Sequence, residues 1–306
     1  MQIIDIKNIK ENIENTAATI GFFDGVHEGH RFLLRQLTEI AATRAQKSLV
    51  VTFREHPNTV LNLQPVKRLL TSFDEKMQLL AALKIDYCAV FDFSETLAEH
   101  SAAQFISLLH SKLSVCTLLV GYDNRFGHNR VEGIDDYVRT GNRIGTEIVK
   151  IQPFIMGKGL EISSSKIRHL IQDSNIETAN RLLGYNYFFS AKVVRGLEIG
   201  RTIGFPTANL ELLCPEKILP IQGAYTVMVT LHNQTFRGMM NIGYNPTRAG
   251  DPLKTVEVNI FDFSQDIYGE ILKITFLNKI RDEQKFDSLA QLKKQLHLDK
   301  DFAEKQ

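Results

Sequence analysis

Residues 17–46 read A-A-T-I-G-F-F-D-G-V-H-E-G-H-R-F-L-L-R-Q-L-T-E-I-A-A-T-R-A-Q. The apolar start predicts a strand over 17–21, and the amphipathic end predicts a helix over 30–46. A glycine-containing turn joins them, so backbone N–H groups and the positive end of the helix dipole meet at one place, which favours an anion. The stretch indicates the first strand-to-helix connection of an α/β fold with a phosphate site.

The same alternation continues through the first half of the chain. We expect strands and helices in turn at 48–53, 74–83, 87–91, 102–113, 116–121, 135–145 and 147–151. Strands that alternate with helices of this length predict βαβ units and a doubly wound, Rossmann-like parallel sheet. Ligands of such sheets bind at the carboxyl ends of the strands.

The pattern changes after a short helix expected at 176–183. Five strands with turns between them are expected at 187–194, 224–231, 235–242, 255–261 and 271–277. They predict a small antiparallel β-barrel, followed by a terminal helix over 288–298 in which Ser288 and Gln291 can form a capping box. A length of 306 residues suits two domains, which we place at 1–183 and 184–306.

Composition excludes several classes of protein. The net charge of +1 argues against a general nucleic-acid or membrane surface, and no apolar run reaches the length of a membrane span. The three cysteines lie far apart, which favours free thiols over a disulfide framework, and the N-terminus lacks a signal-peptide pattern. We therefore expect a cytoplasmic protein, either a monomer or a weak homo-oligomer, without nucleic-acid or membrane partners.

Two histidines stand in the turn Gly21–His30. His27 and His30 are three residues apart and share one face of a helical turn, while Gly29 between them allows close approach of a phosphate. Two imidazoles there can stabilise the charge that develops on a pentavalent phosphorus. The alternatives are a metal site and a solvated histidine pair.

Two later segments fit a nucleotide site. Ile162-Ser-Ser-Ser-Lys-Ile-Arg168 places hydroxyls at a helix start with an arginine one turn in, which suits a triphosphate or an ordinary helix cap. Gly121-Tyr-Asp-Asn-Arg-Phe-Gly127 follows a strand end, where Asp123 can bind a ligand or the segment can be a tight turn.

A second phosphate-type motif, I-G-R-T-I-G-F-P-T-A-N-L, occupies residues 199–210. Its glycines allow a backbone to approach phosphate closely. Thr207 and Asn209 offer the neutral oxygens that Mg²⁺ bound to a nucleotide accepts. Two motifs of this kind in one chain indicate two nucleotide reactions.

Residues 255–263 alternate like a strand with two different faces. Val256, Val258 and Ile260 face one way, and Glu257 and Asn259 face the other. A glutamate on a cavity face can take the proton from an alcohol that attacks phosphorus, whereas a solvent-facing glutamate is the alternative.

Together these motifs resemble those of the bacterial bifunctional riboflavin kinase/FAD synthetases, almost from end to end. Gly21–His30, Gly121–Gly127 and Ile162–Arg168 resemble nucleotidyltransferase motifs, and residues 199–210 resemble the riboflavin kinase motif. The resemblance implies Mg²⁺ and two reactions: ATP phosphorylates riboflavin to FMN in the C-terminal domain, and ATP adenylylates FMN to FAD in the N-terminal domain. Phe22 and Asn124 depart from the usual family pattern.

The resemblance also assigns residues. It implies that His27 and His30 stabilise adenylyl transfer, that Glu257 is the catalytic base of the kinase, and that Thr207 and Asn209 bind Mg²⁺. It implies ligand-binding roles for Gly21, Phe23, Asp24, Gly29, Asp123, Ser163, Ser164, Ser165, Arg168, Gly200, Arg201, Gly204, Pro206, Asn241 and Arg281.

Three rival hypotheses remain: a kinase without useful adenylyl transfer, a flavin-binding regulator that keeps the barrel as a sensor, and transfer of another nucleotide such as CMP. The first is disfavoured by the presence of His27 and His30. The regulator would be expected to lose Thr207 or Glu257, and both are present. Transfer of CMP leaves the barrel unexplained.

Overall fold

The computed structural model describes residues 1–9, 13–55, 68–121, 126–127, 132–157, 160–196, 199–245 and 253–306. The chain forms two compact units, which divide between Ser163 and Ser164, and the short segment Arg68–Leu70 belongs to the second unit. The second unit therefore begins before the expected boundary at 183/184. Asn180 of the intervening helices shows why: its side chain donates to the carbonyl of Phe276 in the barrel and accepts from the amide of Tyr187.

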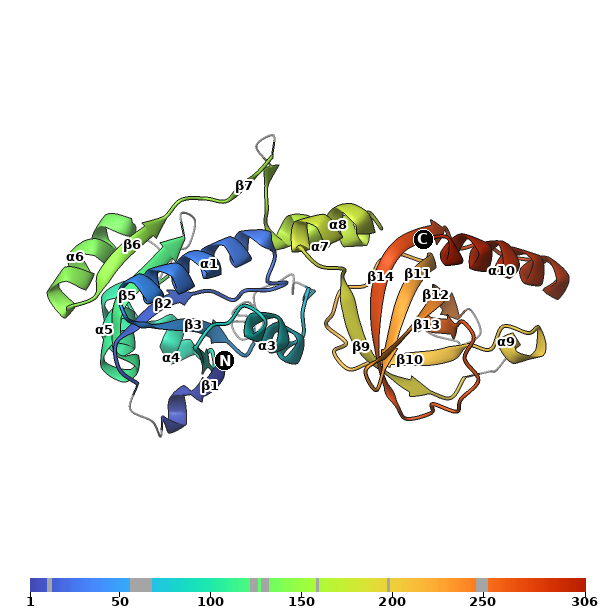
Figure 1. Cartoon of the computed structure of the whole chain (residues 1–306), viewed down its shortest axis with the longest axis horizontal. Helices are drawn as coiled ribbons and strands as arrows, with labels where there is room; N and C mark the ends of the chain where they lie inside the picture. Colours follow the sequence, from blue (N-terminus) through green and yellow to red (C-terminus); the bar gives the residue numbers. More distant parts are fainter. Residues whose placement is uncertain are drawn as a thin grey trace. The chain divides into compact units, whose positions relative to one another are not determined.

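The first unit is built on a six-stranded sheet, all parallel, in the order β1-β4-β3-β2-β5-β6 (Figure 1). The strands are β1 Gln2–Asp5, β2 Thr16–Ile20, β3 Lys47–Phe53, β4 Tyr87–Phe91, β5 Val115–Gly121 and β6 Glu147–Ile151. The strand order reverses direction beside β2, because β3 and β5 flank it on opposite sides. In such sheets the crevice at this reversal is where ligands bind.

Helices cover both faces of this sheet, as the sequence pattern predicted. They are η1 Ile6–Asn8, α1 Glu28–Thr43, α3 Phe73–Ala81, α4 Glu95–Ala98, α5 Ala102–Leu113 and α6 Ile134–Ile144, and a hairpin of β7 Ile155–Met156 and β8 Leu160–Glu161 follows. One apolar core contains Leu34 of α1 and Leu80 of α3, whereas the other contains Leu109 of α5 and Tyr137 of α6. A sheet buried on both faces explains the nearly continuous apolar strands.

The second unit is a closed six-stranded barrel in the order β10-β13-β12-β11-β14-β9. Its strands are β9 Phe188–Val194, β10 Ala208–Leu212, β11 Gly223–Leu231, β12 Gln234–Asn245, β13 Leu253–Ile260 and β14 Ile271–Arg281. Its helices are α7 Ser164–Gln172, α8 Ile176–Leu183, α9 Ile199–Thr202 and α10 Leu289–Glu304. The expected strands and terminal helix are present, with β14 and α10 running further than predicted.

The capping box expected at the last helix forms only in part. Ser288 caps α10, since its side chain accepts a hydrogen bond from the amide of Gln291 at 3.3 Å. The Gln291 side chain accepts from the amide of Asp287 at 3.2 Å. Two hydrogen bonds therefore cap the start of α10. In one of them Gln291 accepts from Asp287, whereas a capping box would require it to accept from Ser288.

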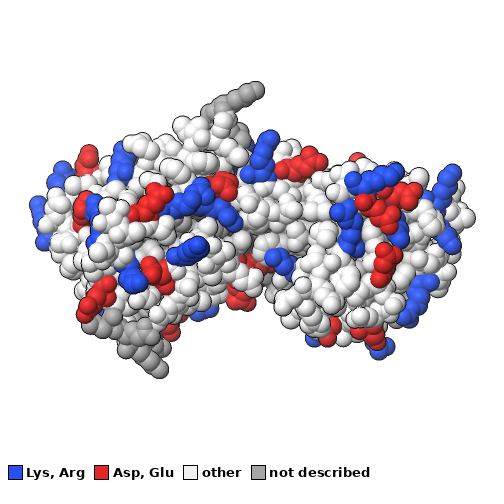
Figure 2. Space-filling view, in the orientation of Figure 1, with Lys and Arg blue, Asp and Glu red and all other residues white. Residues whose placement is uncertain are grey.

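The surface agrees with a nearly neutral chain. Figure 2 shows basic and acidic side chains interspersed over the face in view. In the described part of the chain, no helix combines the length and apolar character required to cross a membrane.

Candidate active sites

The turn after β2 is folded tightly by left-handed backbone. Phe23 has φ of 55°, Gly25 has φ of 80° and Val26 has φ of 36°. The Phe23 ring covers Gly21, where an added Cβ would lie 2.8 Å from the ring. The chain thus passes from the carboxyl end of β2 into α1 within a few residues, at the point where the strand order reverses.

The two histidines lie together at the start of α1, as predicted. His27 is the N-cap, and its Nδ1 accepts from the amide of His30 at 3.3 Å. The two rings stack with centroids 3.6 Å apart and planes 15° apart. His30 also packs edge-to-face against the Phe23 ring. An added Cβ at Gly29 would lie 3.3 Å from the His27 ring, so glycine gives this ring its space.

The surroundings of His30 favour the uncharged form of its ring. Its pKa lies well below the usual value, first because the ring is buried and then because His27 and Lys76 lie nearby. Its Nδ1 atom is buried and makes no hydrogen bond within the described residues. Within those same ranges, no group of three His, Cys, Asp or Glu side chains could hold a metal ion.

Asp24 fastens the turn to Thr71, two residues before α3. It is 3% exposed, and its Oδ1 accepts from the amide of Thr71 at 3.0 Å and from the Thr71 hydroxyl at 3.1 Å. The same hydroxyl accepts from the amide of Gly25 at 3.1 Å. The structure therefore gives Asp24 a bracing contact that the sequence did not predict.

Lys76 of α3 was also missed by the sequence analysis. It is 2% exposed, and its Nζ donates to the carbonyls of Phe53 at 2.8 Å and Phe22 at 3.1 Å and to the Thr52 hydroxyl at 3.3 Å. The ammonium also lies 4.2 Å from the centre of the Phe22 ring. Burial lowers the pKa of Lys76 to about 8.

The remaining predicted residues of the nucleotidyltransferase half are placed in part. The carbonyl of Ile162 lies 3.9 Å from the position of an added Cβ on Gly29, so the chain before Ser163 lies against α1. Helix α7 begins at Ser164 and contains Ser165 and Arg168, whose Nε donates to the carbonyl of Arg68 at 2.6 Å. Asp123 and Asn124 lie outside the described residues.

In the barrel, the predicted functional residues form one row across five neighbouring strands. Asn209 of β10 is opposite Glu257 of β13, which is opposite Asn241 of β12. Ala224 of β11 is opposite Asn241 on one side and opposite Arg281 of β14 on the other. Directly opposed residues share a face of the sheet, so the register collects side chains that are far apart in sequence.

A cavity of about 250 Å³ lies along this row. Its walls include Thr207, Asn241, Glu257 and Arg281 together with apolar side chains of α10 and the preceding loop. The Thr207 hydroxyl donates to Glu257 Oε2 at 3.2 Å. Glu257 is therefore partly buried and lines this cavity.

Arg281 ties α10 to the barrel beside this cavity. Its Nε lies 3.0 Å from both carboxylate oxygens of Asp299, and its Nη2 lies 2.8 Å from Oδ2 of the same carboxylate. Gln295 also donates to Asp299 at 2.8 Å. Asp299 is 2% exposed. The ion pair is thus a buried, bidentate connection that holds one wall of the cavity.

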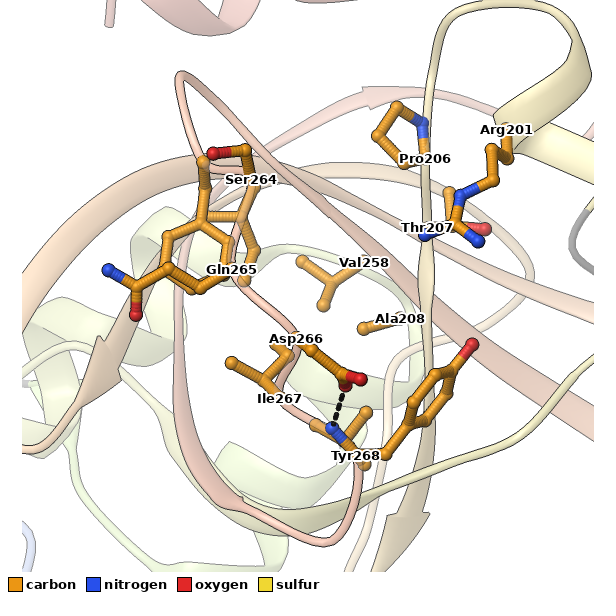
Figure 3. Close-up of a pocket in the computed structure, with 13 residues that line it drawn as sticks. Arg201, Pro206, Thr207, Ala208, Val258, Ser264, Gln265, Asp266, Ile267 and Tyr268 are labelled. Atoms are coloured by element: carbon orange, nitrogen blue, oxygen red, sulfur yellow. Dashed lines mark hydrogen bonds between the residues drawn. The ribbon is translucent and has the colours of Figure 1, made fainter.

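A second cavity of about 410 Å³ lies on the opposite face of β13 (Figure 3). Its walls include Arg201, Pro206, Thr207 and Val258, and residues 263–268 complete them. Figure 3 shows Arg201 beside Thr207 at one side of this cavity, with Tyr268 below them in this view and Ser264 and Gln265 at the other side. Thr207 lines both cavities.

The backbone of the segment before β10 requires glycine at two positions. A Cβ on Gly200 would overlap the carbonyl of Phe205, and Gly204 has φ of 85°. Asn259 donates to the carbonyl of Pro206 at 2.7 Å and fixes the chain just before Thr207. A Cβ on Gly196 would overlap the Asn209 amide, so this glycine leaves the Asn209 side chain its place.

Comparison with known proteins also finds two parts in the chain, with residues 167–182 between them. The FAD synthetase family model matches residues 9–166, and the riboflavin kinase family model matches residues 183–306. Bifunctional riboflavin kinase/FMN adenylyltransferases from Escherichia coli K12 and Bacillus subtilis are 38% and 35% identical; the matches cover 94% and 96% of this chain and 91% and 93% of theirs. The chain belongs to the bifunctional riboflavin kinase/FMN adenylyltransferase family.

The predicted family and its two activities are thereby confirmed. A crystal structure described as a macrolide-efflux protein from Streptococcus pneumoniae also matches, with a TM-score of 0.90, 33% identity and 99% coverage of both chains. Membership of the riboflavin kinase/FMN adenylyltransferase family accounts for the presence of two phosphate-type motifs in separate units.

Proposed function

We propose that the barrel unit holds ATP in the cavity of about 410 Å³ and riboflavin in the cavity of about 250 Å³. The observation that carries this assignment is Thr207, which lines both cavities and donates to Glu257. The terminal phosphate of ATP and the primary alcohol of riboflavin then meet at these two residues. Transfer gives FMN and ADP.

Glu257 accepts the proton of the alcohol as its oxygen attacks the γ-phosphorus. Phosphoryl transfer depends mainly on positioning and on neutralisation of charge, and a positioned base adds to both. Asn241 stands opposite Glu257 in the row and completes the polar wall of the cavity. Arg281 acts on the flavin side by holding α10 in place, through its pair with Asp299.

The donors near Thr207 fit Mg²⁺, since hydroxyl, amide and carboxylate oxygens are the ligands that this ion accepts beside phosphate and water. Thr207 and Asn209 would hold the ion, which neutralises phosphate charge when bound. Gly200, Arg201, Gly204 and Pro206 form the segment that approaches the nucleotide, and Arg201 lines the cavity proposed for it.

The first unit transfers the adenylyl group of a second ATP to FMN and releases pyrophosphate. The attacking phosphate oxygen of FMN is already ionised at neutral pH, so this reaction needs no base of its own. The turn Gly21–His30 provides amides, and its stacked histidines donate to phosphate oxygens. A phosphate oxygen would also give the buried His30 ring the hydrogen-bond partner that it lacks within the described residues.

The other predicted ligand-binding residues keep their proposed roles. Phe23, Asp24 and Gly29 shape the turn, and Asp123, Ser163, Ser164, Ser165 and Arg168 contribute to nucleotide binding. The cytoplasmic location and the monomeric or weakly oligomeric state also stay predictions.

The direct test is chromatography of flavins after the purified chain is incubated with riboflavin, ATP and Mg²⁺. FMN should appear first and FAD later. FMN supplied with ATP and Mg²⁺ in place of riboflavin should give FAD without a lag. Removal of Mg²⁺ with a chelator should stop both steps. FMN without FAD, under conditions where supplied FMN also stays unchanged, would contradict the assignment of the first unit.

A further inference from the structure

Lys76 connects three pieces of the nucleotidyltransferase unit that are separate in sequence. Its ammonium reaches the turn after β2 through the carbonyl of Phe22, and the end of β3 through Thr52 and the carbonyl of Phe53. The Thr52 hydroxyl also donates to the Phe22 carbonyl at 3.2 Å. One buried cation on α3 therefore holds the carboxyl ends of two neighbouring strands.

The contact with Phe22 determines where the next residue points. Phe23 follows directly in the left-handed region, which a bulky side chain occupies only when its surroundings hold it there. Its ring lies over Gly21 and against His30, and His30 stacks on His27. An unbroken path of contacts thus runs from Lys76 to both histidines.

We propose that Lys76 is a positioning residue for adenylyl transfer, which sets the Phe22–Phe23 turn so that His30 and His27 present their rings to the nucleotide. This inference rests on the proposed role of the two histidines. Lys76 does not contact the reacting atoms, because its side chain is buried and its donors are directed to the protein.

Stability alone does not explain a lysine at this position. Burying an ammonium group is costly, and an apolar side chain of similar length fills such a site at no electrostatic cost. The charged or ionisable groups near it are Asp24 and Cys88, which favour its charged form, and His30, whose protonation it disfavours. A methionine in its place would keep most of the volume and lose the three donors.

The test compares Lys76→Met with Lys112→Met, a change at an exposed lysine on α5 of the same unit. Both full-length variants are assayed for FAD formation from supplied FMN and for FMN formation from riboflavin. In Lys76→Met, kcat for adenylyl transfer should fall about 10- to 100-fold, the loss expected from a small misplacement of catalytic groups. The KM for ATP should change much less, and the kinase rate should match that of the parent chain.

Two further readouts separate positioning from simple structural support. Urea unfolding of the first unit should show stability close to that of the parent, since removal of the buried charge offsets the loss of its three hydrogen bonds. The His30 ring, followed by NMR, should titrate at higher pH once the nearby ammonium is removed. Lys76→Arg, which keeps the charge and donors, should recover part of the lost kcat.

Each contrary result counts against the proposal. Unchanged adenylyl transfer in Lys76→Met would overturn it, as would a loss of activity accompanied by unfolding of the unit. A parent chain that makes no FAD from FMN would instead refute the proposed function of the site, so the two failures are distinguishable.

Discussion

Replacement of Glu257 by glutamine tests the chemistry of the kinase site with little change of shape. Glutamine keeps an oxygen that can accept the hydrogen bond from Thr207, which in the parent is 3.2 Å long. The strand register that sets Glu257 beside Asn209 and Asn241 involves only backbone groups and should also persist. The change therefore removes the basic carboxylate and leaves its surroundings.

The expected loss follows from the role of the removed group. A positioned general base contributes about 10²- to 10⁴-fold to a rate, which is about 3–5 kcal/mol of transition-state stabilisation. Because the cavity walls stay in place, the loss should fall on kcat, and the KM for riboflavin should stay near the parent value. Glu211→Gln, an exposed change on the neighbouring β10, is the matched control.

The assay measures initial rates of FMN formation from riboflavin and of FAD formation from supplied FMN in the same preparation. Only the first rate should fall in Glu257→Gln. A kinase rate within about tenfold of the parent would refute the assignment of Glu257 as base, since even weak general-base catalysis exceeds that factor. An equal fall of both rates would show that the variant is damaged as a whole.

Three other changes have definite expected outcomes. Gly196→Ala should displace the Asn209 amide, so the Mg²⁺ concentration needed for half-maximal kinase rate should rise. FAD formation from FMN should stay constant. An unchanged Mg²⁺ dependence of the kinase would count against Asn209 as a ligand. Asp299→Ala removes the carboxylate partner of the partly buried Arg281, at a cost of roughly 1–3 kcal/mol, and calorimetry should show the second unit melting roughly 5 °C lower. Lys76 binds its proton less tightly in the folded chain, where its pKa is about 8 against an ordinary value of 10.5. The free energy of unfolding should therefore rise with pH between those two values. Urea titrations at several pH values should show this rise in the parent and not in Lys76→Met.

The fold was largely predictable because both periodicities are strong in this sequence. The helices and strands of the first unit alternate as expected, and the β-barrel strands lie near the expected ranges. Four strands were missed, namely the two-residue strands β7 and β8 and the longer strands β1 and β10. β1 is a short edge strand in which only Ile4 is buried, and β10 lies inside the motif that was interpreted as a ligand loop.

The candidate sites were predictable only where one motif contains the necessary groups. His27 and His30 lie three residues apart, so the local geometry of a capped helix start brings their rings together. The roles of Lys76 and Asp299 could not be found in this way, since a lysine or aspartate on a helix normally faces solvent. Only the packing of α3 and α10 against distant segments buries them.

The row across the barrel has a consequence for how chains of this family can vary. Each functional residue of the row comes from a different strand, and its neighbours are set by backbone pairing alone. Side chains alternate between the two faces of a strand, so an insertion of one residue within β13 would turn Glu257 toward the barrel interior. The strands of the row must therefore keep their residue count, and an otherwise foldable barrel with one extra residue in β13 would lose phosphoryl transfer.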